Sequence, residues 1–211
     1  MARDCMETTQ TQLNERALRL SYFTVGYNVL EGAASIVAGA VAGSVALVGF
    51  GLDSFVESLS GGVMIWRFQP HGTLTPHEVE QREQRALKIV GSTFYFLAAY
   101  ILFEAGRKLY LAEAAAPSLA GIIITSLSII VMPVLFFAKY QTGRRVRSRS
   151  LVADSKQTLA CVMLSVSVLI GLVLNATLGF WQIDPFIGLV IAGYLFKEGR
   201  DAVKEGRVCS C

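Results

Sequence analysis

The sequence has little charge for its length, since Asp, Glu, Lys and Arg make up only 17% of its 211 residues. A soluble globular domain carries about 25% charged residues, because charge covers its surface. The shortage therefore indicates a membrane protein. The formal net charge of +3 is too small to indicate a nucleic-acid partner without a basic stripe outside the membrane, so we expect no such partner.

Cysteine is also scarce, and the four residues present do not make a disulfide scaffold. Disorder is excluded by the 53% hydrophobic content, and the glycines show no collagen-like period. Cys161 falls inside an apolar run, where most cysteines are merely small apolar residues. Cys5, Cys209 and Cys211 fall in tails that we expect to be cytoplasmic, where thiols stay reduced and structural disulfides are rare.

Long apolar runs account for most of the chain. Runs of about 18 or more apolar residues predict an all-α membrane protein with six transmembrane helices. The predicted spans are 18–41, 44–66, 89–110, 118–138, 151–174, and 185–196 with its flanks. The last is the weakest prediction because its apolar centre is short. The polar segment 1–12 does not look like a signal peptide, so we expect the first span to be retained.

Basic residues predict the orientation of these spans. If the N-terminus is cytoplasmic, every Lys and Arg except Arg107 and Lys108 lies on that side, which satisfies the positive-inside rule. We therefore expect two cytoplasmic tails, residues 1–17 and 204–211, around a transport domain at 18–203. The expected location is the plasma membrane of a prokaryote, as an integral multi-pass protein.

Acidic residues inside predicted spans require a partner or a purpose, because each costs about 2.5–3.5 kcal/mol at the membrane centre. Asp53 and Glu57 lie four residues apart in the second span and therefore share a helical face. In the fifth span Asp154, Gln157 and Cys161 share a face in the same way. Each of these two spans thus carries one polar stripe.

The polar stripes of the second and fifth spans are predicted to lie at the same depth in the membrane. Asp53 is about 15 Å into a span that enters from outside, and Cys161 reaches a similar depth from inside. Asp53 should lie level with Cys161, and Glu57 with Gln157. Two carboxylates, a thiolate and an amide oxygen suit Zn²⁺, with Cd²⁺ favoured by sulfur. Metal binding would displace protons from these acids, which predicts metal/proton exchange.

Less specific interpretations of these residues remain open. The acid pair alone is also compatible with an interhelical hydrogen-bond clamp or a proton relay. Gln157 and Cys161 alone would be ordinary buried residues. The matching depth on antiparallel spans favours a joint metal site.

Several segments resemble the transmembrane part of the cation diffusion facilitator family, which exports divalent metals from the cytoplasm. In that family the second span carries D-x-x-x-D and the fifth H-x-x-x-D. Here the corresponding residues are Asp53 with Glu57, and Gln157 with Cys161, so only Asp53 is unchanged. The resemblance is carried by Asn28, Gly43-Ser44, the stretch ALVGFGLDSFVE (46–57), Ala153-Asp154 in ADSKQTLAC (153–161), Trp181 and Asp184-Pro185.

The departures from the family pattern change what we expect. Losing the usual histidine removes a favoured Zn²⁺ ligand and a proton acceptor, and Cys161 shifts the preference toward softer ions. Most relatives continue into a cytoplasmic ferredoxin-like domain, so this chain is predicted to be a short form without it. The resemblance implies a homodimer that works by alternating access, with no cofactor beyond the transported metal, and a transporter rather than an enzyme.

Other polar residues are weaker candidates. Asp154, Glu31 and Asn28 are candidates for outer-shell or proton-linked roles; Glu31 alone is equally compatible with an interhelical hydrogen bond. His71 and His77 flank a loop with two acids, and Cys209 and Cys211 form a C-x-C tail. Both pairs are candidates for peripheral metal sites. A solvated loop and an inert tail are the simpler interpretations.

The sequence therefore predicts efflux of divalent cations, Zn²⁺ first and Cd²⁺ or another transition metal next, by metal/proton antiport. The alternative is a membrane metal sensor or assembly protein that does not transport. An intramembrane hydrolase is disfavoured because no activated nucleophile accompanies the paired acids.

Overall fold

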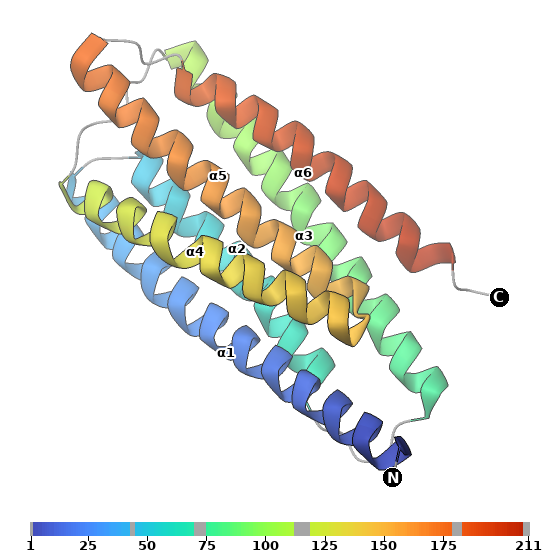
Figure 1. Ribbon diagram of the computed structural model, residues 1–211. Helices are drawn as coiled ribbons and strands as arrows, with labels where there is room; N and C mark the ends of the chain where they lie inside the picture. Colours follow the sequence, from blue (N-terminus) through green and yellow to red (C-terminus); the bar gives the residue numbers. More distant parts are fainter. Residues whose placement is uncertain (1, 43–44, 70–74, 112–118, 179–182, 209–211) are drawn as a thin grey trace.

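The computed structural model describes residues 2–42, 45–69, 75–111, 119–178 and 183–208, and over these residues it is helical with short connections and no strand. The prediction of an all-α fold with six helices is confirmed. Figure 1 shows the helices running alternately up and down a single bundle. The helices are α1 (Ala2–Ala42), α2 (Val45–Phe68), α3 (Pro76–Leu111), α4 (Leu119–Val146), α5 (Arg149–Leu178) and α6 (Ile183–Val208).

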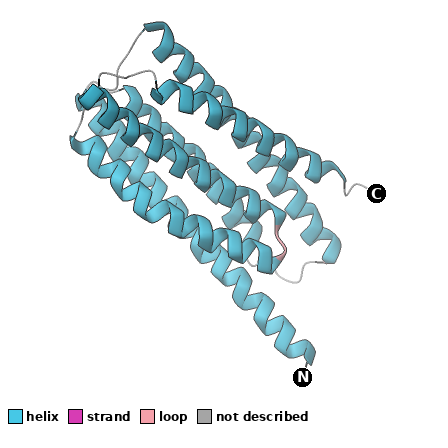
Figure 2. Cartoon of the chain, turned by 45° about the horizontal axis from the view of Figure 1, so that its top comes forward, coloured by secondary structure: helices cyan, strands magenta, loops and turns pink. Residues whose placement is uncertain are grey.

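The packing divides the bundle into two parts. Helices α1, α2, α4 and α5 pack on one another, while α3 and α6 form a close pair that packs on α2 and α5. In Figures 1 and 2 the start of α1 and the end of α6 lie at the same end of the bundle, as an even number of antiparallel helices requires. We call this end of the molecule the terminal end. The start of α3 and the α4–α5 turn also lie there.

Several helices extend beyond the apolar runs that predicted them. Helix α1 begins at Ala2 rather than at residue 18, and α4 continues to Val146 rather than ending at 138. Within the part of the chain that the structure describes, three helical segments are long and apolar enough to cross a membrane, namely α3, α4 and Arg149–Ile170 of α5. Helix α2 carries Asp53 and Glu57, which lower its hydropathy but are buried within the bundle.

Large apolar side chains cover much of the outside of the bundle. Such a surface is expected of a protein whose solvent is lipid, because a water-soluble monomer does not expose extensive apolar patches. The most exposed of these side chains include Leu30, Val41, Phe96, Phe103, Leu119, Ile130, Val134 and Val190.

The start of α3 follows a known capping pattern. Thr75 precedes Pro76, the first helical residue, and the Thr75 N–H donates to Glu78 Oε2 over 2.8 Å. In return, the Glu78 N–H donates to Thr75 Oγ1 over 3.3 Å. This reciprocal capping box satisfies two N–H groups that the helix leaves without partners. Thr75 and Pro76 therefore open this helix.

The basic stretch between α4 and α5 contracts to a tight turn. Arg147 has φ 60°, the left-handed conformation that commonly ends a helix, and the Ser148 N–H donates to the Gly143 carbonyl over 2.9 Å. Helix α5 starts at Arg149 immediately afterwards. The turn therefore places the end of α4 directly beside the start of α5.

Close helix contact depends on two glycines at the α1–α2 interface. A Cβ atom at Gly51 would lie 2.7 Å from the Gly32 carbonyl oxygen, and one at Gly32 would lie 2.9 Å from the Gly51 carbonyl oxygen. The two backbones therefore touch at this point. This contact holds α1 against the face of α2 next to the polar stripe.

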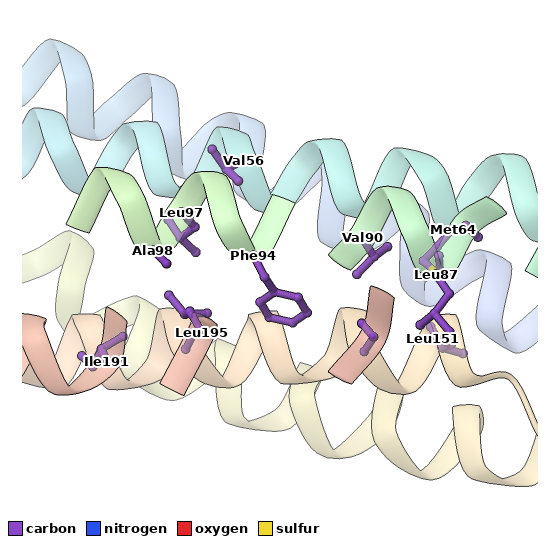
Figure 3. Packing of buried hydrophobic residues seen from close by; sticks show 14 of the residues in the cluster. Val56, Met64, Leu87, Val90, Phe94, Leu97, Ala98, Leu151, Ile191 and Leu195 are labelled. Carbon is purple, nitrogen blue, oxygen red and sulfur yellow. The ribbon is translucent and has the colours of Figure 1, made fainter. Parts of the chain in front are cut away.

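A second set of contacts forms the main apolar core. Figure 3 shows Leu97 and Ala98 of α3 facing Ile191 and Leu195 of α6, with Phe94 beside them. Leu151 of α5 joins Met64 and Leu87 further along the same core. This core fixes α3 and α6 against the helices that carry the acidic residues.

Candidate functional site

The two acids of α2 face the interior of the bundle. Asp53 is 3% exposed and Glu57 is 1% exposed, and both face α5. Cys161 of α5 is buried within hydrogen-bonding reach of Asp53. The structure thus places a carboxylate and a thiol from two antiparallel helices next to each other.

Glu57 has different neighbours one turn along α2. The hydroxyl of Thr158 on α5 donates to Glu57 Oε1. The ammonium of Lys139 on α4 lies 3.7 Å from the same oxygen. Glu57 Oε2 is buried and has no hydrogen-bond partner among the described residues. One half of this carboxylate is therefore occupied by protein groups and the other half is not.

Lys139 is the cation at the centre of this region. Its side chain is fully buried, and its Nζ lies 2.8 Å from Asp154 Oδ2. It also donates to Thr158 Oγ1 over 3.0 Å. The other Asp154 oxygen accepts from Ser60 Oγ of α2 over 2.6 Å. An ion-pair network thus connects α2, α4 and α5 on the terminal-end side of Asp53.

Gln157 has its hydrogen-bond partner on α3 rather than on α2. Its Oε1 accepts from Thr93 Oγ1 of α3 over 3.2 Å, while its buried Nε2 has no partner among the described residues. Among the described residues, no three His, Cys, Asp or Glu side chains lie close enough together to hold a metal ion. The structure brings Asp53 and Cys161 together and leaves Glu57 and Gln157 with other partners.

Glu31 and Asn28 approach the same region from α1. Glu31 accepts from Tyr27 Oη over 3.1 Å and from Ser54 Oγ of α2 over 2.9 Å. Asn28 is fully buried beside Glu57, yet both polar atoms of its amide lack a hydrogen-bond partner of good geometry among the described residues. Glu31 thus serves as an interhelical hydrogen-bond acceptor, and Asn28 has spare hydrogen-bonding capacity next to Glu57.

A cavity of about 70 Å³ reaches Asp53 from the side of the bundle where α2 begins and α3 ends. Tyr100, Glu104 and Lys108 line it from one face of α3. Gly188 of α6 and Ser167 of α5 line other walls. Asp53 therefore lies between a cavity on one side and the Lys139 network on the other.

The peripheral candidates are only partly described by the structure. His71, Cys209 and Cys211 lie outside the described residues, as do Gly43-Ser44 and Trp181. His77 is exposed in the first turn of α3, where its Nε2 lies 2.9 Å from Gln81 Nε2. The predicted peripheral metal sites stay predictions.

Three residues of the polar network were not predicted from the sequence, namely Lys139, Thr158 and Ser60. The apolar run of the fourth span ends at 138, so the sequence predicts a cytoplasmic position for Lys139. One signal was available, because Lys139 and Asp154 lie at nearly equal sequence distances from the α4–α5 turn. Residues placed symmetrically about a tight helical hairpin lie level with each other.

Comparison with known proteins decides the family. Residues 22–208 match the cation efflux transmembrane domain, which is most of the chain. The chain belongs to the cation efflux family. This finding confirms the resemblance to cation diffusion facilitators, whose members are transporters, and it identifies the chain as an integral multi-pass membrane protein.

Two relatives of this cation efflux protein come from different kinds of organism. Transmembrane protein 163 of Xenopus laevis is 25% identical over 200 residues, which cover 92% of this chain and 69% of the relative. A protein of Synechocystis named as an uncharacterized transporter is 24% identical over 170 residues, which cover 79% of this chain and 55% of the relative. Relatives thus occur in both a eukaryote and a prokaryote.

Proposed function

We propose that this cation efflux protein exports divalent metal ions, Zn²⁺ first and Cd²⁺ or another transition metal next, from the cytoplasm in exchange for protons. The observation that carries the proposal is the buried pair Asp53 and Cys161, contributed by two antiparallel helices, with Asp53 also lining a cavity. A carboxylate and a thiol together suit a cation of borderline softness.

The proposed ligands are Asp53, Glu57, Gln157 and Cys161. Asp53 and Cys161 are already adjacent, whereas Glu57 and Gln157 must leave their contacts with Thr158 and Thr93 to join them. Transport by alternating access provides such a rearrangement, because the site is rebuilt each time it opens to the other side. Asn28 and Glu31 would support the site from α1.

The proposed orientation has both termini in the cytoplasm. The cavity above Asp53 then opens toward the outside, and the Lys139 network closes the cytoplasmic side. Binding of a cation to buried carboxylates and a thiol releases protons, which is the physical basis of the proposed exchange. We further propose that the working unit is a homodimer.

Flux into proteoliposomes tests this function. Purified protein is reconstituted, and Zn²⁺ uptake is followed with an entrapped indicator, with and without a pH gradient. We expect uptake that a proton gradient accelerates, and uptake near the protein-free background for Asp53→Ala. Cys161→Ala should retain part of the Zn²⁺ uptake, because both carboxylates, Asp53 and Glu57, remain to bind the ion.

Two outcomes would contradict the proposal. Unchanged uptake by Asp53→Ala would show that the metal does not pass through this site. Metal binding by the wild type without any uptake would favour a sensor over a transporter. Arg19→Gln serves as the control, because Arg19 pairs with Glu15 in an exposed position on α1 and is no proposed ligand.

A further inference from the structure

Lys139 lies in the interior of the helix bundle, where lysine is rare in membrane proteins. Its side chain is fully buried, and it contacts groups on α2 and α5 from its place on α4. Burying a charge is costly unless it is paired, so the network around Lys139 must balance that cost. Two carboxylates, Asp154 and Glu57, provide the balance.

The two carboxylates bind Lys139 unequally. Its Nζ lies 2.8 Å from Asp154 Oδ2 but 3.7 Å from Glu57 Oε1. Asp154 is also held by Ser60, so it stays in place whatever happens to Glu57. Lys139 can therefore give up Glu57 and still keep a counter-ion at contact distance.

Glu57 is correspondingly the carboxylate that can change partner. Lys139 and Thr158 occupy its Oε1, while its Oε2 is buried without a hydrogen-bond partner among the described residues. Asn28, beside it, also has unused polar atoms. An oxygen with spare capacity in a buried, polar region is a ready ligand for a cation.

We propose that Lys139 is a tethered cation that competes with the transported divalent ion for Glu57. This inference rests on the proposed function. In the structure, the ammonium and the Thr158 hydroxyl contact Oε1 of Glu57. When a divalent ion binds Asp53 and Cys161, Glu57 exchanges the ammonium for the metal, and Lys139 remains on Asp154.

The competition makes Lys139 a positioning residue that sets metal affinity. An ion that binds too tightly cannot be released, so a built-in competitor favours turnover over affinity. The ammonium also supplies a positive charge next to Glu57 after the ion has left. Asp154 and Glu57 therefore have a cation beside them both when the ion is bound and after it has left.

Zn²⁺ binding to the purified full-length protein in detergent, measured by titration calorimetry, tests the proposal. We expect Lys139→Gln to lower the Kd for Zn²⁺ on the order of tenfold or more, because a unit charge near the ligand is removed. Lys139→Arg keeps the charge, so its Kd for Zn²⁺ should be closer to the wild-type value than that of Lys139→Gln.

A double variant separates competition from simple charge balance. Lys139→Gln leaves Asp154 buried without a cation and can destabilise the fold, whereas Lys139→Gln with Asp154→Asn removes both charges of the pair. If total charge alone sets affinity, the double variant should bind Zn²⁺ like the wild type. Competition for Glu57 predicts that it binds tighter than the wild type.

The outcomes for the inference and for the function are distinct. If Asp53→Ala abolishes Zn²⁺ uptake but the double variant binds Zn²⁺ no tighter than the wild type, the function stands and the role of Lys139 is overturned. If the wild type neither binds nor transports Zn²⁺, the proposed function fails, and the inference fails with it. Tighter binding by Lys139→Gln and by the double variant, with Lys139→Arg close to the wild type, supports the competition.

Discussion

Asp53 and Glu57 show how one helix turn can separate the roles of two similar residues. Both are buried carboxylates on one face of α2, but Asp53 faces the thiol of Cys161 and Glu57 faces a lysine and a threonine. A carboxylate beside a thiol is free to bind a cation. A carboxylate beside an ammonium must first exchange that partner.

The thiol of Cys161 should determine which metals this protein prefers. Cys161→Ser replaces a soft sulfur by a hard oxygen of similar size, so Cd²⁺ binding should weaken more than Zn²⁺ binding. We expect the Cd²⁺ affinity to fall by at least about tenfold. Loss of a residue that only supports a metal ligand already lowers metal affinity by about tenfold or more, and loss of the ligand itself should have at least that effect. Competition titrations with Cd²⁺ and Zn²⁺ measure the ratio.

Ala160→Ser is a matched control for this prediction. Ala160 is fully buried on the same helix but packs in the apolar core rather than beside Asp53. Its variant also gains a buried hydroxyl and should leave the ratio of Cd²⁺ to Zn²⁺ affinity unchanged. A Cys161→Ser protein with the wild-type ratio would show that the sulfur does not bind the metal.

Some contacts of single residues could be predicted from the sequence and others could not. Helical periodicity and depth place Asp53 level with Cys161, because both quantities follow from counting residues along straight helices. Rotation of a helix about its axis is set by packing, and here it turns Gln157 toward Thr93. The burial of Lys139 does not follow from the sequence, because a lysine at the end of an apolar run usually extends to water.

At the scale of helices, the close approach of α1 and α2 depends on glycine. Gly51→Ala would place a methyl group 2.7 Å from the Gly32 carbonyl oxygen and 2.8 Å from Ile36 Cγ1. One of these atoms belongs to the backbone, so the two helices must move apart. We expect a loss of about 1–3 kcal/mol in the free energy of unfolding, the usual cost of overpacking.

Unfolding in mixed micelles, followed by circular dichroism, measures this loss. Gly62→Ala is the control on the same helix, because a Cβ there meets nothing within 4 Å. It should be neutral or stabilise the protein by up to about 1 kcal/mol through helix propensity. Equal behaviour of the two variants would mean that α1 and α2 are not in backbone contact.

The helices themselves could be predicted better than their ends. An apolar run identifies the part of a helix that lies in lipid, but a helix continues for as long as its backbone is satisfied. Helix α3 thus begins at its capping box, well before its apolar run, and α4 ends only where Arg147 adopts the left-handed conformation. Capping residues in the sequence mark the start of α3. The end of α4 is harder to predict, because the residue in the left-handed conformation is not a glycine.

At the scale of the whole molecule, the two sides of Asp53 differ. A cavity lies on one side, and the other side is closed by the Lys139 network and, nearer the terminal end, by contacts around Glu83. Glu83 of α3 accepts from Arg67 Nε of α2 over 2.8 Å, from Ser148 Oγ over 3.0 Å and from the Ser150 N–H over 2.7 Å. One carboxylate therefore joins α2, α3 and the α4–α5 turn.

Loss of this junction should destabilise the terminal end of the bundle. The Glu83 side chain is only 5% exposed, so Glu83→Gln leaves Arg67 and the Ser150 N–H with a weaker partner in a buried position. Breaking a buried ion pair typically costs about 3–5 kcal/mol, and the retained amide oxygen should place this variant near the lower limit. Glu83→Ala should approach the upper limit.

Glu80→Gln is the control one turn away on α3. Its ion pair with Arg149 has a similar N–O distance, 2.7 Å, but the Glu80 side chain is 45% exposed, so its loss should cost less than about 1 kcal/mol. Unfolding in mixed micelles compares the variants.

Because alternating access must open the closed side, Glu83→Gln should also make Cys161 react faster with a thiol reagent added from the terminal end. An equal stability loss in the Glu80 and Glu83 variants, with unchanged Cys161 reactivity, would show that the Glu83 junction does not hold this side closed.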